Sequence, residues 1–226
     1  MNERLKAIYR LIPPGKGVID VGTDHGYIPV CLAGEGYPGR IIALDIRSGP
    51  LAAAKRTAER AGLSDRIEFL LCDGLDGCPP DAVDTIVIAG MGGDAICGIL
   101  DRAEWCMAPA YKLILQPMTK QEVLRYWLVN NGFKLEEEQL VEDRGVIYQI
   151  LTARYTGINE RLTDAELYVG SFEKAAGHPL FAKLLEQENH RFSVSLAGQE
   201  QAGLGRDSMQ QSIYEELLSM REKLHE

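Results

Sequence analysis

The chain has 226 residues, of which 46% are hydrophobic and 25% are charged, and these are ordinary values for a globular protein. A chain of this length can bury about 70% of the surface that its unfolded form exposes, so it needs neither a metal nor disulfides to hold a core. Its 24 basic and 33 acidic residues give a net charge of −9, which at first argues against a nucleic-acid partner, because such partners usually meet a basic surface.

Short apolar runs typical of buried strands alternate with helical patterns along the first half of the chain. The runs are nearly continuous rather than alternating, as expected for strands that are buried on both faces. This order predicts βαβ units and a parallel sheet. The expected strands cover residues 17–21, 40–45, 66–72, 83–89 and 111–116, and the expected helices cover residues 27–33, 50–61, 94–101 and 121–130.

Two further strand patterns, 133–141 and 146–155, are joined by the polar segment Glu142-Asp143-Arg144-Gly145. A polar turn that ends in glycine is typical of an antiparallel hairpin, which here would close the edge of the sheet. We therefore expect an α/β domain with seven strands, of which the last pair is antiparallel.

Only helical patterns follow the last expected strand. Residues 160–176 are expected to form one helix, and two apolar stripes, 180–196 and 213–224, are separated by a glycine-bearing loop. Two stripes with a turn between them predict an antiparallel helical hairpin. We therefore expect two domains, 1–156 and 157–226.

The cysteine pattern and the hydropathy exclude several other classes of protein. The five cysteines are odd in number and lack Cys-x-x-Cys spacing, which favours reduced thiols over a disulfide framework or a zinc cluster. The N-terminus is charged within its first six residues, and no stretch approaches the roughly 18 to 20 apolar residues of a membrane span. We therefore expect a cytoplasmic protein with no metal site and no membrane partner.

The segment after the first expected strand carries the first functional signal. It reads Asp20-Val21-Gly22-Thr23-Asp24-His25-Gly26 and leads directly into a helix. Loops that bind dinucleotides have the pattern Gly-x-Gly-x-x-Gly, but here the middle position is Asp24, whose carboxylate would repel a pyrophosphate. S-adenosylmethionine has no phosphate and carries a positive sulfonium. The pattern Asp-x-Gly-x-Asp-x-Gly therefore favours this methyl donor.

Acidic residues also close the next two expected strands. Asp45 could accept hydrogen bonds from both ribose hydroxyls, and Asp73 could reach the adenine amino group. Each acid alone could instead be a helix cap or a turn residue. Three acids at the carboxyl ends of three successive strands, where open α/β sheets bind ligands, favour S-adenosylmethionine as the cofactor. The expected cofactor-binding residues are Asp20, Gly22, Thr23, Gly26, Asp45, Ile46, Asp73, Gly74, Ala89, Gly90, Met91 and Gly92.

The fourth expected strand ends in Ala89-Gly90-Met91-Gly92-Gly93, and the fifth ends in Gln116-Pro117-Met118. A tight strand-to-helix turn would explain one or two of these glycines. Four small residues around one methionine favour instead a space for a flat base beside the methyl group. The sequence lacks here the Asn/Asp-Pro-Pro-Tyr motif of many exocyclic amino methyltransferases. That counts against methylation of an exocyclic amine.

These motifs resemble those of the bacterial tRNA (adenine-N1)-methyltransferase family TrmK, which modifies adenine 22. The resemblance spans residues 3–155, and Met118 stands where the family pattern has asparagine. It implies a class I, Rossmann-like methyltransferase domain with a seven-stranded sheet, followed by a helical, coiled-coil-like domain that matches in pattern only. The segments that carry it are Gly22-Thr23-Asp24-His25-Gly26-Tyr27-Ile28-Pro29, Gly49-Pro50 with Ala54-Lys55-Arg56, Asp73-Gly74-Leu75, Ile88-Ala89-Gly90-Met91-Gly92-Gly93 and Leu113-Ile114-Leu115-Gln116-Pro117.

The resemblance implies methyl transfer from S-adenosylmethionine to N1 of an adenine in tRNA. N1 has its own lone pair, so it needs no prior deprotonation, and the product carries a positive charge. Because N1 lies on the Watson–Crick edge, the base must first be unpaired or extruded. We expect Asp24 to accept from the N6 amino group and to stabilise the charged product. His25 is expected to support the loop or to act chemically, and Tyr27 to stack on the base or cofactor or to pack on a helix.

Basic side chains near the expected site are candidates for contact with tRNA, although each could equally belong to a solvated helix face. The segment 156–226 has 7 basic and 12 acidic residues, so it could clamp tRNA by shape or join a weak homodimer, and a monomer is the alternative. The expected substrate-binding residues are Arg4, Lys6, Arg10, Arg47, Lys55, Arg56, Arg60, Gly93, Gln116 and Pro117.

Two other functions stay open from the sequence. A methyltransferase for a small molecule is favoured by the net charge and by the lack of a dense stripe of lysine and arginine. A non-catalytic module that binds S-adenosylmethionine or RNA is opposed by the three strand-end acids and the glycine-rich loop. An assay with unmodified tRNA separates all three.

Overall fold

The computed structural model describes residues 1–203, 205 and 207–224. The chain forms two compact units, Met1–Glu160 and Arg161–Glu226. Every strand among the described residues lies in the first unit, and the second unit is helical.

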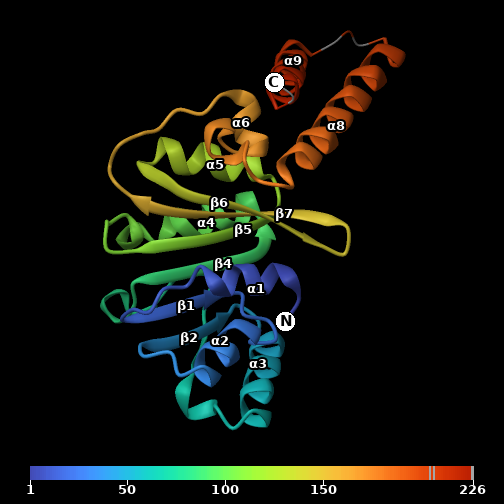
Figure 1. Cartoon of the computed structure of the whole chain (residues 1–226). Coiled ribbons are helices and arrows are strands. Elements are labelled where there is room, and N and C mark those ends of the chain that lie inside the picture. Colours follow the sequence, from blue (N-terminus) through green and yellow to red (C-terminus); the bar gives the residue numbers. More distant parts are fainter. Residues whose placement is uncertain (204, 206, 225–226) are drawn as a thin grey trace. The chain divides into compact units, whose positions relative to one another are not determined.

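The first unit is built around a seven-stranded sheet with the order β3-β2-β1-β4-β5-β7-β6 (Figure 1). Strands β1 to β5 are parallel, and β7 runs antiparallel to both of its neighbours, β5 and β6. The expected Rossmann-like sheet with an antiparallel last pair is therefore confirmed. The strands are β1 (Gly17–Val21), β2 (Arg40–Asp45), β3 (Glu68–Leu71), β4 (Thr85–Gly92), β5 (Lys112–Thr119), β6 (Phe133–Asp143) and β7 (Val146–Tyr155).

Helices cover both faces of this sheet. Alternate strand residues such as Val18, Val87 and Ile114 pack with α1, α2 and α3 in one buried apolar cluster. Helices α4 and α5 pack on β4, β5 and β6 from the opposite face. The helices are α1 (Glu3–Arg10), α2 (Tyr27–Gly34), α3 (Ser48–Arg60), α4 (Gly93–Arg102) and α5 (Gln121–Asn130), with short 3-10 helices η1 (Ser64–Arg66), η2 (Pro80–Ala82) and η3 (Glu104–Cys106).

The order of the strands places a crevice between β1 and β4. The chain leaves these neighbours towards opposite sides of the sheet, and ligands of open α/β sheets bind at such a switch point. Val21 pairs with Leu44 on one side and with Ile88 on the other. The residues that follow these three, which carry the glycines and acids of the expected site, therefore lie at one level of the sheet, where β4 continues beside β5 to Gly92.

A two-residue turn, Arg144-Gly145, joins β6 and β7. Both residues have positive φ angles, 52° and 82°, as the tight hairpin turns that match strand twist require. Strand β7 pairs with β5 only through Leu151 to Arg154. The part of the hairpin near its turn, which includes Tyr148, therefore pairs within itself.

The second unit contains the helical hairpin that the sequence predicts. The Nδ2 of Asn189 donates to the Leu217 carbonyl at 3.4 Å, and the hydroxyl of Ser195 donates to Oε1 of Gln210 at 2.9 Å. As the residue number in α8 rises from 189 to 195, that of its partner in α9 falls from 217 to 210, so α8 and α9 are antiparallel. The helices of this unit are α6 (Asp164–Val169), α7 (Phe172–Ala175), α8 (Phe181–Gln201) and α9 (Ser208–Lys223).

The expected single helix over residues 160–176 is wrong. Thr163 caps α6 through a hydrogen bond from the Glu166 amide, so the helix begins only at Asp164. Gly170 then takes a φ of 89°, a conformation that ends a helix, and α7 restarts after it. The spacing of apolar residues is compatible with one helix, but the positive φ of Gly170 divides the segment into two helices.

Three further structural facts bear on the function. No helix among the described residues has the length and the apolar character that crossing a membrane requires. Within the same residues, no group of three or more histidine, cysteine or acidic side chains is arranged to hold a metal ion. Cysteines 31, 72, 78, 97 and 106 are free thiols.

Candidate active site

Two adjoining cavities lie at the carboxyl edge of the parallel strands. The larger cavity, of about 530 Å³, extends from β1 across β2 and β3 to α4. The smaller cavity, of about 300 Å³, lies between β1, β4 and α1. Gly22, Asp24, Ala89 and Gly90 line both, so a ligand in one cavity can continue into the other.

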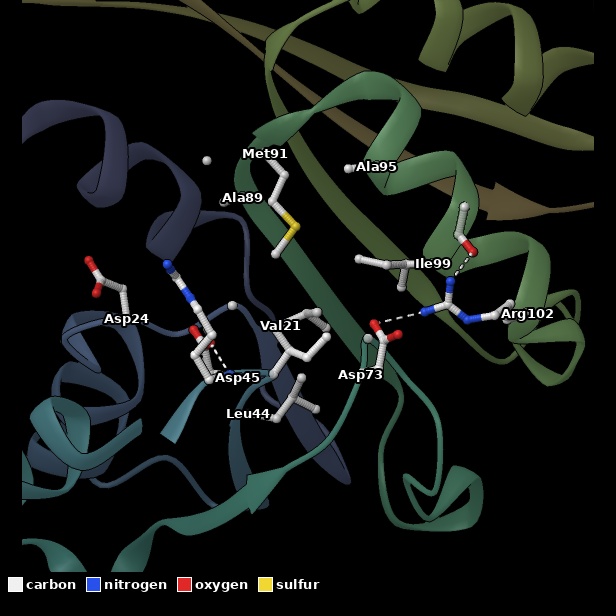
Figure 2. Close-up of a pocket in the computed structure, with 16 residues that line it drawn as sticks. Val21, Asp24, Leu44, Asp45, Asp73, Ala89, Met91, Ala95, Ile99 and Arg102 are labelled. Atoms are coloured by element: carbon white, nitrogen blue, oxygen red, sulfur yellow. Dashed lines mark hydrogen bonds and ion pairs between the residues drawn. The ribbon is translucent and has the colours of Figure 1, made fainter. Parts of the chain in front are cut away.

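The acids that close β2 and the next strand line the larger cavity. Asp45 is buried and accepts a hydrogen bond from the Arg47 amide at 2.9 Å. Asp73 is half exposed and forms an ion pair with Arg102 at 2.9 Å. In Figure 2, Asp24 and Asp73 lie on opposite sides of the cavity, and the side chain of Met91 points between them.

Glycines let the backbone form the floor of this cavity. Gly22 has a φ of 70°, and a Cβ atom there would lie 2.3 Å from the terminal carbon of Met91. Gly90 has a φ of 81°, and a Cβ there would lie 3.5 Å from Nη1 of Arg4. Larger residues at these positions would strain the backbone and fill the space in which a ligand would lie. Gly26 serves packing instead, because a Cβ there would press on Ala54.

Asp20 lies beneath the loop rather than on its surface. It is 6% exposed, and the hydroxyl of Thr23 donates to its carboxylate at 2.7 Å. Burial raises the pKa of Asp20 to about 7; the charge of Asp45 raises this pKa as well, whereas the Thr23 hydrogen bond lowers it. Asp20 is thus suited to hold the shape of the loop.

Asp24 occupies the rim that the two cavities share. Its backbone has a φ of 47°, a value that residues other than glycine rarely adopt. Residues with such strained backbones are concentrated at functional sites. Its side chain is 66% exposed, and its Oδ2 lies 3.8 Å from Nε2 of His25. The His25 ring in turn lies 5.6 Å from the ring of Tyr27, which is 47% exposed. The loop therefore presents a carboxylate and two flat rings to solvent.

The smaller cavity contains an arginine that the sequence placed among the contacts to tRNA. Arg4 lies on the first turn of α1 and is half-buried. Its Nη1 donates to Oε1 of Gln116, and its guanidinium carbon lies 5.6 Å from the centre of the Tyr148 ring. Three segments far apart in the sequence therefore meet at this guanidinium.

Several expected substrate residues do not line either cavity. Gln116 is fully buried, and Gly93 packs so closely on the Lys120 carbonyl that a Cβ would lie 2.1 Å from its oxygen. Gln116 and Gly93 were expected to touch a substrate; in the structure, Gln116 accepts a hydrogen bond from Arg4 and Gly93 permits close packing. Also outside both cavities lie the expected substrate residues Lys6, Arg10, Lys55, Arg56, Arg60 and Pro117, together with Gly92, which was expected to bind the cofactor.

Arg102 and Ile99 line the larger cavity, and the sequence reasoning missed them. Both lie on α4, where Ile99 follows Ala95 by four residues and Arg102 follows Ile99 by three. The three residues therefore share one face of that helix. Arg102 also lies 3.5 Å from Asp76, so it links two acids of the loop after β3. The periodicity of α4 marks this face, but only the fold brings it against that loop.

The chain matches a family model described as a methyltransferase domain over residues 1–151. It is 32% identical over 195 residues to the tRNA (adenine(22)-N(1))-methyltransferase of Bacillus subtilis, which covers 83% of this chain and 81% of the relative. The crystal structure of the B. subtilis m1A22 tRNA methyltransferase TrmK superposes with a TM-score of 0.80 at 29% identity, covering 100% of this chain and 97% of that one. A Streptococcus pneumoniae structure in complex with S-adenosyl-L-methionine superposes with a TM-score of 0.85 at 27% identity, covering 98% and 99%.

Proposed function

The chain belongs to the tRNA (adenine(22)-N(1))-methyltransferase family, and on that premise we propose that it methylates N1 of adenine 22 in tRNA with S-adenosylmethionine as the donor. The observation that carries the proposal is Asp24, an exposed carboxylate held at the rim of both cavities. The match to the methyltransferase-domain model and the similarity to the B. subtilis enzyme confirm the family that the loop and strand-end motifs predict.

The larger cavity fits the donor. Its glycine floor leaves room beside Gly22 and Gly90, and its acids match a ligand with hydroxyl and amino donors and a positive sulfonium. Asp45 would accept from the ribose hydroxyls, and Asp73, held by Arg102, would face the adenine. When bound, S-adenosylmethionine supplies a methyl group that a neutral nitrogen can attack.

The outer rim of the smaller cavity fits the target base. Asp24, His25 and Tyr27 are exposed there, whereas Asp20 and Thr23 are buried farther in. Asp24 would accept from the N6 amino group, which turns N1 towards the larger cavity. The same carboxylate then lies beside the positive charge that develops on the ring. His25 would support Asp24, and Tyr27 would offer a surface on which the extruded base stacks.

Exposed cations on α3 would bind the tRNA backbone. Arg56 and Arg60 are both exposed, and their spacing of four residues places them on one face of the helix. Arg47, which precedes this helix, is 75% exposed and lines the larger cavity. Contacts from these cations to phosphates would position the tRNA without reading its sequence.

The test uses an unmodified tRNA transcript, labelled S-adenosylmethionine and the full chain, followed by nucleoside analysis. We expect 1-methyladenosine, and we expect none with a transcript whose adenine 22 is replaced by guanosine. N6-methyladenosine would contradict the proposed N1 chemistry. Label in neither transcript would exclude tRNA as the substrate and favour a small-molecule methyltransferase or a module without turnover.

A further inference from the structure

The loop that follows β3 carries two cysteines whose thiols lie in contact. Cys72 directly follows the strand and is half-buried, and Cys78 follows six residues later and is buried. Their thiols share a hydrogen bond. Among the five cysteines, all of which the structure describes, this is the pair whose sulfurs are recorded in contact. Neighbouring thiols are the arrangement from which a disulfide bond forms.

The residues between the two cysteines belong to the expected donor site. Asp73 and Gly74 line the larger cavity. The amide of Cys72 donates to the Asp45 carbonyl at 3.2 Å, and its thiol donates to the Gly74 carbonyl at 3.6 Å. A change at the sulfur of Cys72 therefore acts directly on the backbone that forms one side of this cavity.

Helix α4 holds the middle of the same loop. Arg102 forms an ion pair with Asp73 at 2.9 Å and lies 3.5 Å from Asp76 (Figure 2). A disulfide bond would draw the two sulfurs from contact to bonding distance and would remove the thiol that donates to Gly74. Because Arg102 holds the acids between the two cysteines, the loop would have to change its shape around Asp73.

We propose that Cys72 and Cys78 are a modification site at which a small-molecule disulfide forms a reversible disulfide bond, and that this bond weakens binding of the methyl donor. The consequence for the donor rests on the proposed function, whereas the disulfide itself depends only on the two thiols. Methylation would thereby respond to the redox state around the protein.

The oxidant that we propose is a disulfide of the glutathione type. The thiolate of Cys72 attacks one sulfur of the oxidant, forms a mixed disulfide and releases one glutathione thiolate. Cys78 gives its proton to solvent, attacks the Cys72 sulfur and releases the second glutathione. The two cysteine thiols thus lose two protons and two electrons, and the glutathione disulfide takes them up as it becomes two glutathione thiols.

Cys72 is suited to react first. Burial raises the pKa of both thiols, that of Cys78 to about 12, whereas the hydrogen bond from Cys78 acts to lower the pKa of Cys72. Cys72 is also the more exposed of the two. Because only the thiolate attacks, the pair reacts slowly at neutral pH and faster in mild alkali.

The first measurement locates the disulfide in the full chain. The protein is incubated with oxidised glutathione at pH 8.5, free thiols are then alkylated, and the chain is cleaved on the N-terminal side of its aspartates. Cleavage before Asp73 and Asp76 separates the two cysteines. We expect mass spectrometry to find peptides 65–72 and 76–80 joined, and to find them separate after reduction with dithiothreitol.

The second measurement is the affinity for S-adenosylhomocysteine by isothermal titration calorimetry. We expect oxidation to weaken binding by about 10-fold, the effect of one misplaced hydrogen bond, and dithiothreitol to restore it. Cys72→Ser and Cys78→Ser should each bind equally well with and without the oxidant. Cys31→Ser is the matched control, because Cys31 is half-buried like Cys72 but lies outside both cavities, and this variant should keep the full response.

Separate peptides after oxidation, or glutathione held on Cys72 without the internal bond, would overturn the proposal. Unchanged affinity of the disulfide form would overturn it as well, and so would a loss of affinity that persists in Cys78→Ser. If Cys78→Ser unfolds, Cys72→Ser decides, because its position is only half-buried. The proposed function fails separately, since a chain that changes its ligand affinity in this way could still not methylate tRNA.

Discussion

Asp20 lies in β1 and Asp24 lies four residues later in the loop that follows, and their surroundings give them different properties. Asp20 is buried under the loop and bonded to Thr23, whereas Asp24 is exposed at the rim. Burial raises the pKa of Asp20, because a buried carboxylate loses hydration that nearby donors only partly replace. The exposed Asp24 lines both cavities. One acid therefore shapes the loop, and the other is proposed to act on the substrate.

Replacement of Asp24 by alanine tests its role. We expect Asp24→Ala to lower single-turnover methylation of tRNA by about 100-fold or more, because a preorganised group beside the developing charge is lost. Affinity for S-adenosylhomocysteine should change by less than about threefold, which is under 1 kcal/mol. Asp65→Ala, at an exposed acid outside both cavities, is the matched control. Normal turnover of Asp24→Ala would remove this residue from the mechanism.

The raised pKa of Asp20 predicts a pH dependence of stability. The folded state keeps the proton of Asp20 up to about pH 7, whereas the unfolded chain releases it near pH 3.8. The folded state therefore binds more protons between these values, and its stability falls as the pH rises through them. We expect Asp20→Asn to remove this part of the slope when the free energy of unfolding is measured by denaturant at pH 4.5 and pH 7.5. Identical slopes for the variant and the wild type would contradict the assignment.

At the scale of elements, α5 is tied to the terminal hairpin by a buried polar cluster. Arg125 is fully buried, and its Nε donates to Glu138 of β6 at 2.8 Å. Its Nη2 donates to the same carboxylate at 2.6 Å and to Gln149 of β7 at 2.5 Å. Because a buried charge must keep its partners, these bonds fix where the helix lies on the sheet.

Breaking this cluster should be costly, and removing both charges should cost less. We expect Arg125→Met to lower the free energy of unfolding by about 3–5 kcal/mol, because the Glu138 carboxylate stays buried. The double variant Arg125→Met/Glu138→Met should recover part of that loss. Arg154→Met is the matched control, because its ion pair with Glu136 lies half-exposed on the same hairpin and should be worth about 1 kcal/mol or less. The free energy of unfolding is measured with denaturant for the wild type and the three variants. Equal losses for Arg125→Met and Arg154→Met would contradict this assignment.

At the scale of the whole molecule, part of the net charge of −9 comes from acids that line the larger cavity. Asp24, Asp45 and Asp73 line the larger cavity, where acids suit a cationic donor. The cations that are proposed to bind tRNA gather at one helix: Arg47 precedes α3, and Arg56 and Arg60 lie on it. Binding of tRNA therefore does not require the chain as a whole to be basic. An acidic protein that binds RNA through few cations should bind it modestly and with a strong dependence on salt.

The division into two units predicts the behaviour of a shortened chain. All residues that line the two cavities lie between Asn2 and Arg102, within the unit that ends at Glu160. We expect a chain that ends at Glu160 to bind S-adenosylhomocysteine within about threefold of the full chain, a difference of less than 1 kcal/mol. Calorimetry on both proteins, with circular dichroism to verify folding, tests this. A folded fragment without affinity for the ligand would show that the helical unit is needed for the donor site.

The strands, most of the helices and the family could be predicted from the sequence, and so could the acids that are proposed to bind the donor. These features depend on short-range signals, because apolar runs mark buried strands and the motif Asp20 to Gly26 combines its residues within one loop. Tertiary structure alone decided that Gln116 supports Arg4, that Arg102 pairs with Asp73, and that Gly170 divides the expected helix. The two contacts join positions 112 and 29 residues apart, and the break depends on one backbone angle. No local pattern encodes such pairings, since they arise only when the order of the strands brings distant ends to one edge of the sheet.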